Sequence, residues 1–96
     1  MKPGWVYIMT NMPFGTLYIG VTGNLPARAF HHRTGTGSVF CAKYGLTRLV
    51  YVEHHVRIGD AIAREKAMKA SKRSWKTKLI ETNNPAWDDL FETING

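Results

Sequence analysis

The sequence predicts an α/β domain in which a small sheet begins with a β-hairpin and is covered by helices. Two stretches rich in β-branched and aromatic residues, 4–9 and 16–21, come first and are separated by turn-forming residues. Segments with helical spacing and helix caps follow, with one more strand-like stretch among them. A chain of 96 residues with 44% hydrophobic content can bury one core, so we expect a single domain over residues 1–96.

The first two stretches predict a hairpin whose loop is residues 11–14. In that register Thr10 faces Gly15, and Tyr7 lies directly across from Tyr18 on one face of the sheet. Taken singly, each tyrosine is an ordinary strand aromatic that packs in a core. Their predicted pairing makes them candidates for a site.

A short helix is predicted over residues 25–33, because Asn24 is a good N-cap and Pro26 is tolerated in a first turn. Gly- and Thr-rich residues follow and end it. Arg28 and His32 are four residues apart, so they share a face of this helix.

The middle and end of the chain predict one strand and three helices. Residues 49–53 favour a third strand, and residues 60–70 and 74–80 favour helices. Asn84-Pro85 predicts the start of a last helix, with Pro at its first position. Four apolar residues follow at helical spacing: Trp87, Leu90, Phe91 and Ile94. The predicted order is strand, strand, helix, strand, helix, helix, helix.

Three aromatic residues are candidates for stacking on a nucleic-acid base. Trp75 is four residues from Leu79, and Trp87 belongs to the apolar stripe of the last helix, so we expect both in the core. Phe14, at the hairpin turn, is the better candidate for an exposed aromatic.

The chain is strongly basic, with a formal charge of +6 and a pI near 9.8. This charge is typical of a protein that meets a polyanion, and seven of the thirteen basic residues lie between positions 64 and 78. A solvated helical face is the alternative explanation of that run. The basic residues proposed to contact nucleic acid are Lys43, Arg64, Lys66, Lys69, Lys72, Arg73 and Lys76.

Cysteine content and hydropathy indicate a cytoplasmic protein without a membrane segment. The single Cys41 cannot form an intramolecular disulfide, and no signal peptide is recognisable at the N-terminus. No apolar run approaches the length of a bilayer span.

Glu65 is the most informative single residue. It shares a helical stripe with the apolar residues Ile58, Ala61, Ile62 and Met68, which places a carboxylate at or near the core. An unpaired buried carboxylate costs several kcal/mol, so Glu65 needs a side-chain cation or a metal ion. The alternative is an ordinary i,i+4 surface pair with Lys69.

Arg28 is the second charged candidate. It borders an apolar stripe of Leu25 and Ala29, and its planar guanidinium suits bidentate contact with a phosphate. A structural salt bridge to Glu65 or Glu53 is an equal alternative.

Six positions in register resemble the GIY-YIG nuclease family. Trp5-Val6-Tyr7 stands where the first motif (GIY) falls, and Tyr18-Ile19-Gly20 matches the second (YIG) in every letter. Tyr7 to Tyr18 is eleven positions, Tyr18 to Arg28 is ten, and Arg28 to His32 is four. The later family motifs are matched by Arg64-Glu65-Lys66, Lys69 and residues 84–90. The resemblance covers nearly the whole chain and is greatest to small single-domain bacterial members, which are related to nuclease domains of DNA repair and homing enzymes.

The resemblance implies a three-stranded antiparallel sheet flanked by helices and a metal-dependent endonuclease with weak sequence preference. Glu65 would bind one Mg²⁺, with Mn²⁺ able to substitute, and a water would attack the phosphodiester. Tyr18 would be the general base, with His32 as the alternative, and Tyr7 would hydrogen-bond to the water or to Tyr18. Arg28 would stabilise transition-state charge. DNA is favoured over RNA as the substrate.

The sequence departs from the family pattern after the second motif. Some members carry a lysine there that helps to activate the tyrosine, whereas Val21 and Thr22 follow here, and Lys43 is the candidate to replace it. This departure leaves two other function classes open: a nucleic-acid-binding module that has lost catalysis, and a basic module that binds an acidic protein.

Overall fold

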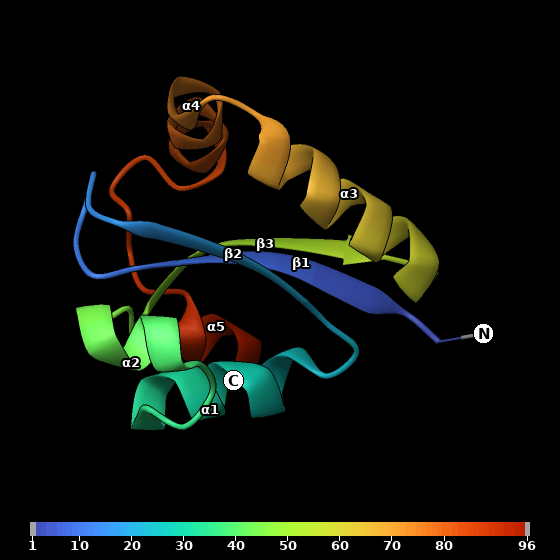
Figure 1. Ribbon diagram of the computed structural model, residues 1–96, viewed down its shortest axis with the longest axis horizontal. Helices are drawn as coiled ribbons and strands as arrows, with labels where there is room; N and C mark the ends of the chain where they lie inside the picture. Colours follow the sequence, from blue (N-terminus) through green and yellow to red (C-terminus); the bar gives the residue numbers. More distant parts are fainter. Residues whose placement is uncertain (1, 96) are drawn as a thin grey trace.

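Three antiparallel strands form the centre of the computed structural model, which describes residues 2–95. Their order is β2 (Leu17–Thr22), β1 (Gly4–Thr10) and β3 (Arg48–His55), so β1 is central. Two helices, α3 (Ile58–Ala70) and α4 (Arg73–Asn83), cover one face. The other face carries α1 (Leu25–Thr34), α2 (Val39–Tyr44) and α5 (Phe91–Asn95) (Figure 1). The expected three-stranded sheet flanked by helices is therefore confirmed.

The central strand divides the core into two layers because its side chains alternate between the faces of the sheet. Val6 and Ile8 pack with Met68 of α3 and Ile80 of α4 in one buried cluster. On the opposite face, a second cluster joins β1 to α1 and α2 through Tyr7, Met9, Leu25, Ala29 and Cys41. Tyr7 is thus a core residue, and any chemistry at its hydroxyl takes place in a desolvated environment.

The hairpin register differs from the prediction by two residues. Tyr7 pairs with Gly20, and Tyr18 pairs with Met9, so the two tyrosines are not directly opposite each other. The connection is longer than four residues because Thr16 N–H donates to the Asn11 side chain, which keeps residues 11–16 out of the strands. An even shift preserves the face of every side chain, so Tyr7 and Tyr18 still share one face.

Gly20 explains why this register is favoured. A Cβ atom at Gly20 would lie 2.4 Å from both Cζ and the hydroxyl oxygen of Tyr7. The Tyr7 ring therefore lies over the bare backbone of its partner strand, and only glycine leaves it that room. The glycine of the second motif is therefore needed for the tyrosine of the first motif to pack against β2.

Helix α2 was not predicted, although its ends carry recognisable caps. The Ser38 side chain accepts from Cys41 N–H at 3.3 Å, and Gly45 ends the helix with φ of 65°. The helix has only six residues and little apolar periodicity, which is why the pattern did not show it. It brings Phe40 and Cys41 to the face of the sheet that carries Tyr18.

The predicted last helix is wrong in its start. Residues 84–90 form an irregular segment, and α5 begins only at Phe91. Asn84 does not cap a helix at this point: its amide donates to Val50 O and Asp88 O, and its oxygen accepts from Asp88 N–H. Trp87 has φ of 56°, which no α-helix accommodates.

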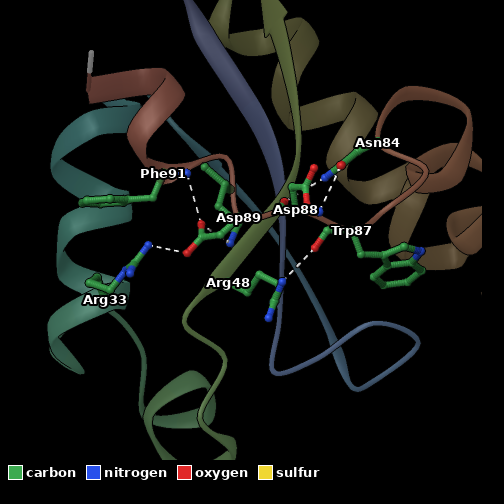
Figure 2. Close-up of polar contacts among 8 residues, drawn as sticks. Arg33, Arg48, Asn84, Trp87, Asp88, Asp89 and Phe91 are labelled. Carbon is green, nitrogen blue, oxygen red and sulfur yellow. Dashed lines mark hydrogen bonds and ion pairs between the residues drawn. The ribbon is translucent and has the colours of Figure 1, made fainter.

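The irregular segment follows the outer edge of β3. Leu90 N–H donates to Leu49 O at 2.7 Å, and the Asp89 carboxylate accepts from Leu49 N–H and pairs with Arg33 of α1 (Figure 2). Arg33 also lies over the Phe91 ring. The segment thereby ties α1, and with it His32, to the sheet.

The two tryptophans considered as base-stacking candidates differ. Trp87 is buried, as predicted, but Trp75 is 40% exposed, with the Arg64 guanidinium 5.3 Å from its ring centre. Phe14 is exposed at the hairpin turn, as predicted, and one side of its ring contacts Trp87.

Within residues 2–95 no helix is long and apolar enough to cross a membrane.

Candidate active site

A hydrogen-bonded cluster joins Tyr7 to the two functional residues of α1. Arg28 Nε donates to the Tyr7 hydroxyl oxygen at 3.3 Å, and the same hydroxyl lies 2.9 Å from His32 Nε2. The helical spacing of Arg28 and His32 places both side chains on the face that packs against β1. The prediction that they share a face is confirmed, and Arg28 contacts tyrosine rather than either acidic residue proposed as its partner.

Burial fixes the protonation of this cluster. Desolvation raises the pKa of Tyr7 to about 12, against a smaller lowering by the hydrogen bond from Arg28. Desolvation also lowers the pKa of His32 to about 4, with a further contribution from Arg28. At neutral pH the phenol is therefore protonated and the imidazole neutral. The Tyr7 hydroxyl donates a hydrogen bond to His32 Nε2. His32 Nδ1 is buried and has no hydrogen-bond partner within the described residues.

Tyr18 lies beside the cluster but closer to solvent. Its ring centre is 6.4 Å from that of Tyr7 and 5.5 Å from that of His32, and its residue is only partly buried. The pKa of Arg28 is raised, chiefly by its hydrogen bond with Tyr7 and less by its interaction with Tyr18. The Arg28 guanidinium thus lies between the buried phenol and the more exposed one.

An open groove runs along the outer edge of β2, past Tyr18. It is lined from one side by Phe40 of α2 and from the other by Lys69 of α3 and Lys76 of α4. In the part of the chain that the structure describes, no strand pairs with this edge of β2, which is why side chains from both faces of the sheet meet here. The groove combines a phenol and two ammonium groups in a volume of about 320 Å³, enough for a phosphate group.

Aromatic side chains extend the site outwards along α2. Phe40 stacks against Tyr18 with ring centres 6.2 Å apart, and Tyr44 contacts Phe40 at 4.9 Å. Both Phe40 and Tyr44 are more than 40% exposed. Sequence reasoning did not single out these residues, and the available signal was the cap pair Ser38 and Gly45 that marks the helix carrying them.

Glu65 lies on the predicted inward stripe of α3. Its side chain is only 14% exposed, and its Oε2 is 3.2 Å from Lys69 Nζ. The structure therefore combines the two interpretations of the sequence: the carboxylate faces inward, and it pairs with the lysine four residues later. Ile62, which the sequence placed on the same stripe, is exposed instead.

The Glu65 carboxylate fits a hard divalent cation that keeps most of its own waters. Within residues 2–95 no group of three or more His, Cys, Asp or Glu side chains could enclose a metal ion. Magnesium does not need such a group, since one carboxylate and the substrate phosphate are sufficient anchors. The mostly buried carboxylate, which pairs with Lys69 of the groove, would provide the protein's share of such a donor set.

The remaining basic candidates have different surroundings. Arg64 donates two hydrogen bonds to Glu53, and Arg73 donates to the Phe14 and Gly15 carbonyls of the hairpin loop. Their guanidinium groups thus serve as structural links. Two other lysines, Lys66 and Lys72, are exposed on the surface of the helical layer.

Lys43, proposed to take the place of the lysine after the second motif, lies over the Tyr44 ring at 5.4 Å. It also lines a separate open pocket formed with residues 35–39 and Ala42. The described contacts of Lys43 therefore place it on the aromatic extension of the site rather than at Tyr18.

Comparison with known proteins gives the family of the chain. A family model described as the GIY-YIG catalytic domain matches residues 3–79, which include all three strands and every proposed catalytic residue. A UPF0213 protein of Staphylococcus haemolyticus is 38% identical over 85 residues, covering 84% of this chain and 98% of the relative. A UPF0213 protein of Pseudomonas aeruginosa is 35% identical over 77 residues, covering 79% and 73% respectively. No solved structure matches the chain significantly. The chain therefore belongs to the GIY-YIG nuclease family and resembles its small bacterial UPF0213 members.

Proposed function

We propose that this protein is a metal-dependent endonuclease that hydrolyses phosphodiester bonds of DNA with little sequence preference. The observation that carries the proposal is the placement of Tyr18 at an open, lysine-lined groove, beside the cluster that Arg28 forms with the buried Tyr7 and His32. Glu65 contacts the lysine on the far side of that groove. Within the groove Tyr18 adjoins the Arg28 cluster and Lys69 pairs with the Glu65 carboxylate, which supports a backbone phosphate as the ligand.

Tyr18 is the best candidate for the general base that activates the attacking water. Tyr7 is excluded from that role by the burial that raises its pKa to about 12. His32 is buried, and its Nε2 is engaged by the Tyr7 hydroxyl. Tyr18 alone of the three opens on the groove. A phenol is a weak base at neutral pH, so its proton must leave under the influence of nearby positive charge.

The buried cluster acts by orientation and charge. His32 accepts a hydrogen bond from the Tyr7 hydroxyl, and the same hydroxyl accepts one from Arg28. The three side chains therefore hold one another in a fixed geometry. Arg28 is then pre-positioned to stabilise the negative charge that develops on the phosphoryl oxygens. Because the guanidinium is fixed before substrate binds, little reorganisation is needed in the transition state.

Glu65 would hold a single Mg²⁺ ion, which when bound supplies Lewis-acid polarisation of the phosphate and a water of lowered pKa. Mn²⁺ prefers the same oxygen ligands and should substitute for it.

Lysines and aromatic residues around the groove provide contacts that do not depend on sequence. Lys69 and Lys76 line it and are placed to neutralise backbone phosphates. Phe40 and Tyr44 expose ring faces next to it, a combination common in surfaces that contact nucleic acid. Weak sequence preference follows because these contacts do not involve hydrogen bonds to base edges.

A second candidate, a nucleic-acid-binding module without catalysis, is favoured by one observation. The carboxylate expected to hold the metal is paired with Lys69 at 3.2 Å. If that pair persists with substrate bound, the groove binds phosphate but cannot recruit an ion.

Incubation with supercoiled plasmid separates these functions. We expect the wild type to nick or linearise plasmid with Mg²⁺ or Mn²⁺, and Glu65→Ala to lose roughly 100-fold or more of that rate while still binding DNA. Glu81→Ala removes an exposed carboxylate of α4 and should cleave like the wild type. Intact plasmid with both the wild type and Glu81→Ala, despite DNA binding, would instead identify a binding module.

A further inference from the structure

The lysine that pairs with Glu65 belongs to two sites at once. Lys69 Nζ is 3.2 Å from Glu65 Oε2, and the same side chain lines the groove with Tyr18 and Lys76. The proposed metal ligand and the proposed phosphate contact therefore form an ion pair with each other. A metal ion at Glu65 and the ammonium at its present position would compete for one carboxylate.

The two partners differ in freedom. The Glu65 side chain is 14% exposed and fixed by its inward position on α3, whereas the Lys69 side chain is 54% exposed. The ammonium of an exposed lysine sits on a flexible four-carbon chain and stays hydrated when it leaves its partner. Lys69 is thus the partner that moves.

A second ammonium group limits where Lys69 can go. Lys76 Nζ donates to the Lys69 carbonyl oxygen at 3.4 Å, and both side chains line the same groove. Two ammonium groups in one groove repel each other unless an anion lies between them. With no phosphate present, Glu65 is the anion that pairs with Lys69 among the described residues. A phosphate in the groove would offer a second.

We propose, on the basis of the proposed function, that Lys69 exchanges between Glu65 and a backbone phosphate of bound nucleic acid. In the free protein Lys69 occupies the carboxylate and weakens metal binding. Nucleic acid in the groove draws the ammonium to its phosphate and leaves Glu65 free for the ion. Lys69 is thereby a positioning residue that makes the metal site depend on substrate, and free protein holds its ion weakly.

Metal affinity of the free protein gives the first test. Mn²⁺ binding, followed by electron paramagnetic resonance, is compared in the wild type, Lys69→Met, Lys66→Met and Glu65→Gln. Lys69→Met should bind Mn²⁺ roughly three- to tenfold more tightly, because it removes a competing cation from the carboxylate. Lys66→Met removes the same charge from an exposed position on the same helix and should stay within about twofold of the wild type.

Coupling to nucleic acid gives the second test. Tyr18→Phe serves as background so that a labelled DNA duplex is not cleaved, and its affinity is measured by fluorescence anisotropy with and without Mn²⁺. The coupling between two ligands of one protein is reciprocal. The factor by which Mn²⁺ strengthens DNA binding therefore equals the factor by which DNA strengthens Mn²⁺ binding. Adding Lys69→Met should reduce this factor by about the same three- to tenfold that free-protein metal binding gained.

The outcomes separate this inference from the function on which it rests. Loss of Mn²⁺ binding in Glu65→Gln together with wild-type affinity in Lys69→Met keeps the metal site and overturns the exchange. Equal Mn²⁺ affinity in the wild type and Glu65→Gln overturns the metal site itself. If Lys69→Met and Lys66→Met both bind Mn²⁺ more tightly than the wild type, the cause is the lower net charge of the protein. That result also overturns the exchange.

Discussion

Burial separates the chemistry of residues that look equivalent in the sequence. Tyr7 and Tyr18 are both strand tyrosines of a hairpin, yet one is 1% exposed with a pKa raised to about 12, and the other opens on the groove. The sequence predicted that they share a face and that Arg28 and His32 join them. It could not predict which phenol is buried, because that depends on packing of α1 and α2 over the central strand.

His32 should make the stability of the protein depend on pH. Its pKa is lowered from 6.5 to about 4 in the folded state, so the unfolded chain binds the proton more tightly. Stability from this residue is fully present above pH 6.5 and is lost as the pH falls towards 4. The loss is of order 2 to 3 kcal/mol. Urea unfolding at pH 7 and pH 4.5 measures it.

His32→Gln, which cannot titrate, should lose less stability than the wild type over the same interval. His54→Gln changes an exposed imidazole of β3 instead and should behave like the wild type. Identical pH dependence in the wild type and His32→Gln would show that the buried imidazole is not held neutral.

At the scale of elements, the hairpin positions the site through one glycine. Tyr7 can lie against β2 only because Gly20 has no side chain, and this contact fixes which residues of the two strands are paired. The predicted four-residue loop put Tyr18 opposite Tyr7. The real loop is longer, and the tyrosines meet diagonally through their rings.

Gly20→Ala should therefore destabilise the fold and displace Tyr7. A Cβ atom 2.4 Å from the phenol forces the ring or the strand to move, at a cost of about 1 to 3 kcal/mol. Gly59→Ala is the matched control, because a Cβ there meets nothing within 4 Å and alanine favours helix α3 by up to about 1 kcal/mol. Urea midpoints measure both. Equal changes in the two variants would contradict this account of the motif.

Sequence patterns predicted the elements that carry strong local signals. The hairpin, α1, β3, α3 and α4 each have alternation, helical spacing or a cap, and all are present within a few residues of their predicted bounds. Helix α2 is too short for periodicity. Residues 84–90 carry a cap-like Asn-Pro, but Asn84 bonds to Val50 O across the fold, a contact that no local pattern reveals. Trp75 and Ile62 have the spacing of core residues and are exposed, since α3 and α4 present a narrower buried face than the pattern predicts.

At the scale of the whole molecule, the basic residues cluster between positions 64 and 78, but they have different roles. Part of the basic run is engaged within the protein, as with Arg64 at Glu53 and Arg73 at the hairpin loop. Lys69 and Lys76 instead face the groove. The net charge of +6 predicted a polyanionic partner, but only the fold shows which cations are placed beside Tyr18.

DNA affinity should therefore depend on salt in a way that is specific to the groove. Lys76→Met should reduce the slope of log affinity against log salt concentration by about one, because one phosphate contact is lost. Lys78→Met removes the same charge from the other side of α4, where it lines a separate pocket with Ser74 and Glu81, and should alter the slope less. Anisotropy titrations without divalent ions measure both, and equal slopes in the two variants would show that the groove does not contact phosphate.

The most direct test of the central claim compares the tyrosine of the groove with the tyrosine of the aromatic extension in a single-turnover cleavage assay with Mg²⁺ and a labelled DNA. Tyr18→Phe removes the proposed base and should lower the rate by roughly 100-fold or more, with DNA affinity unchanged. Tyr44→Phe removes an equivalent hydroxyl from the aromatic extension and should cleave at nearly the wild-type rate. Equal rates for the wild type, Tyr18→Phe and Tyr44→Phe would contradict the assignment of this groove as the place where the phosphodiester bond is broken.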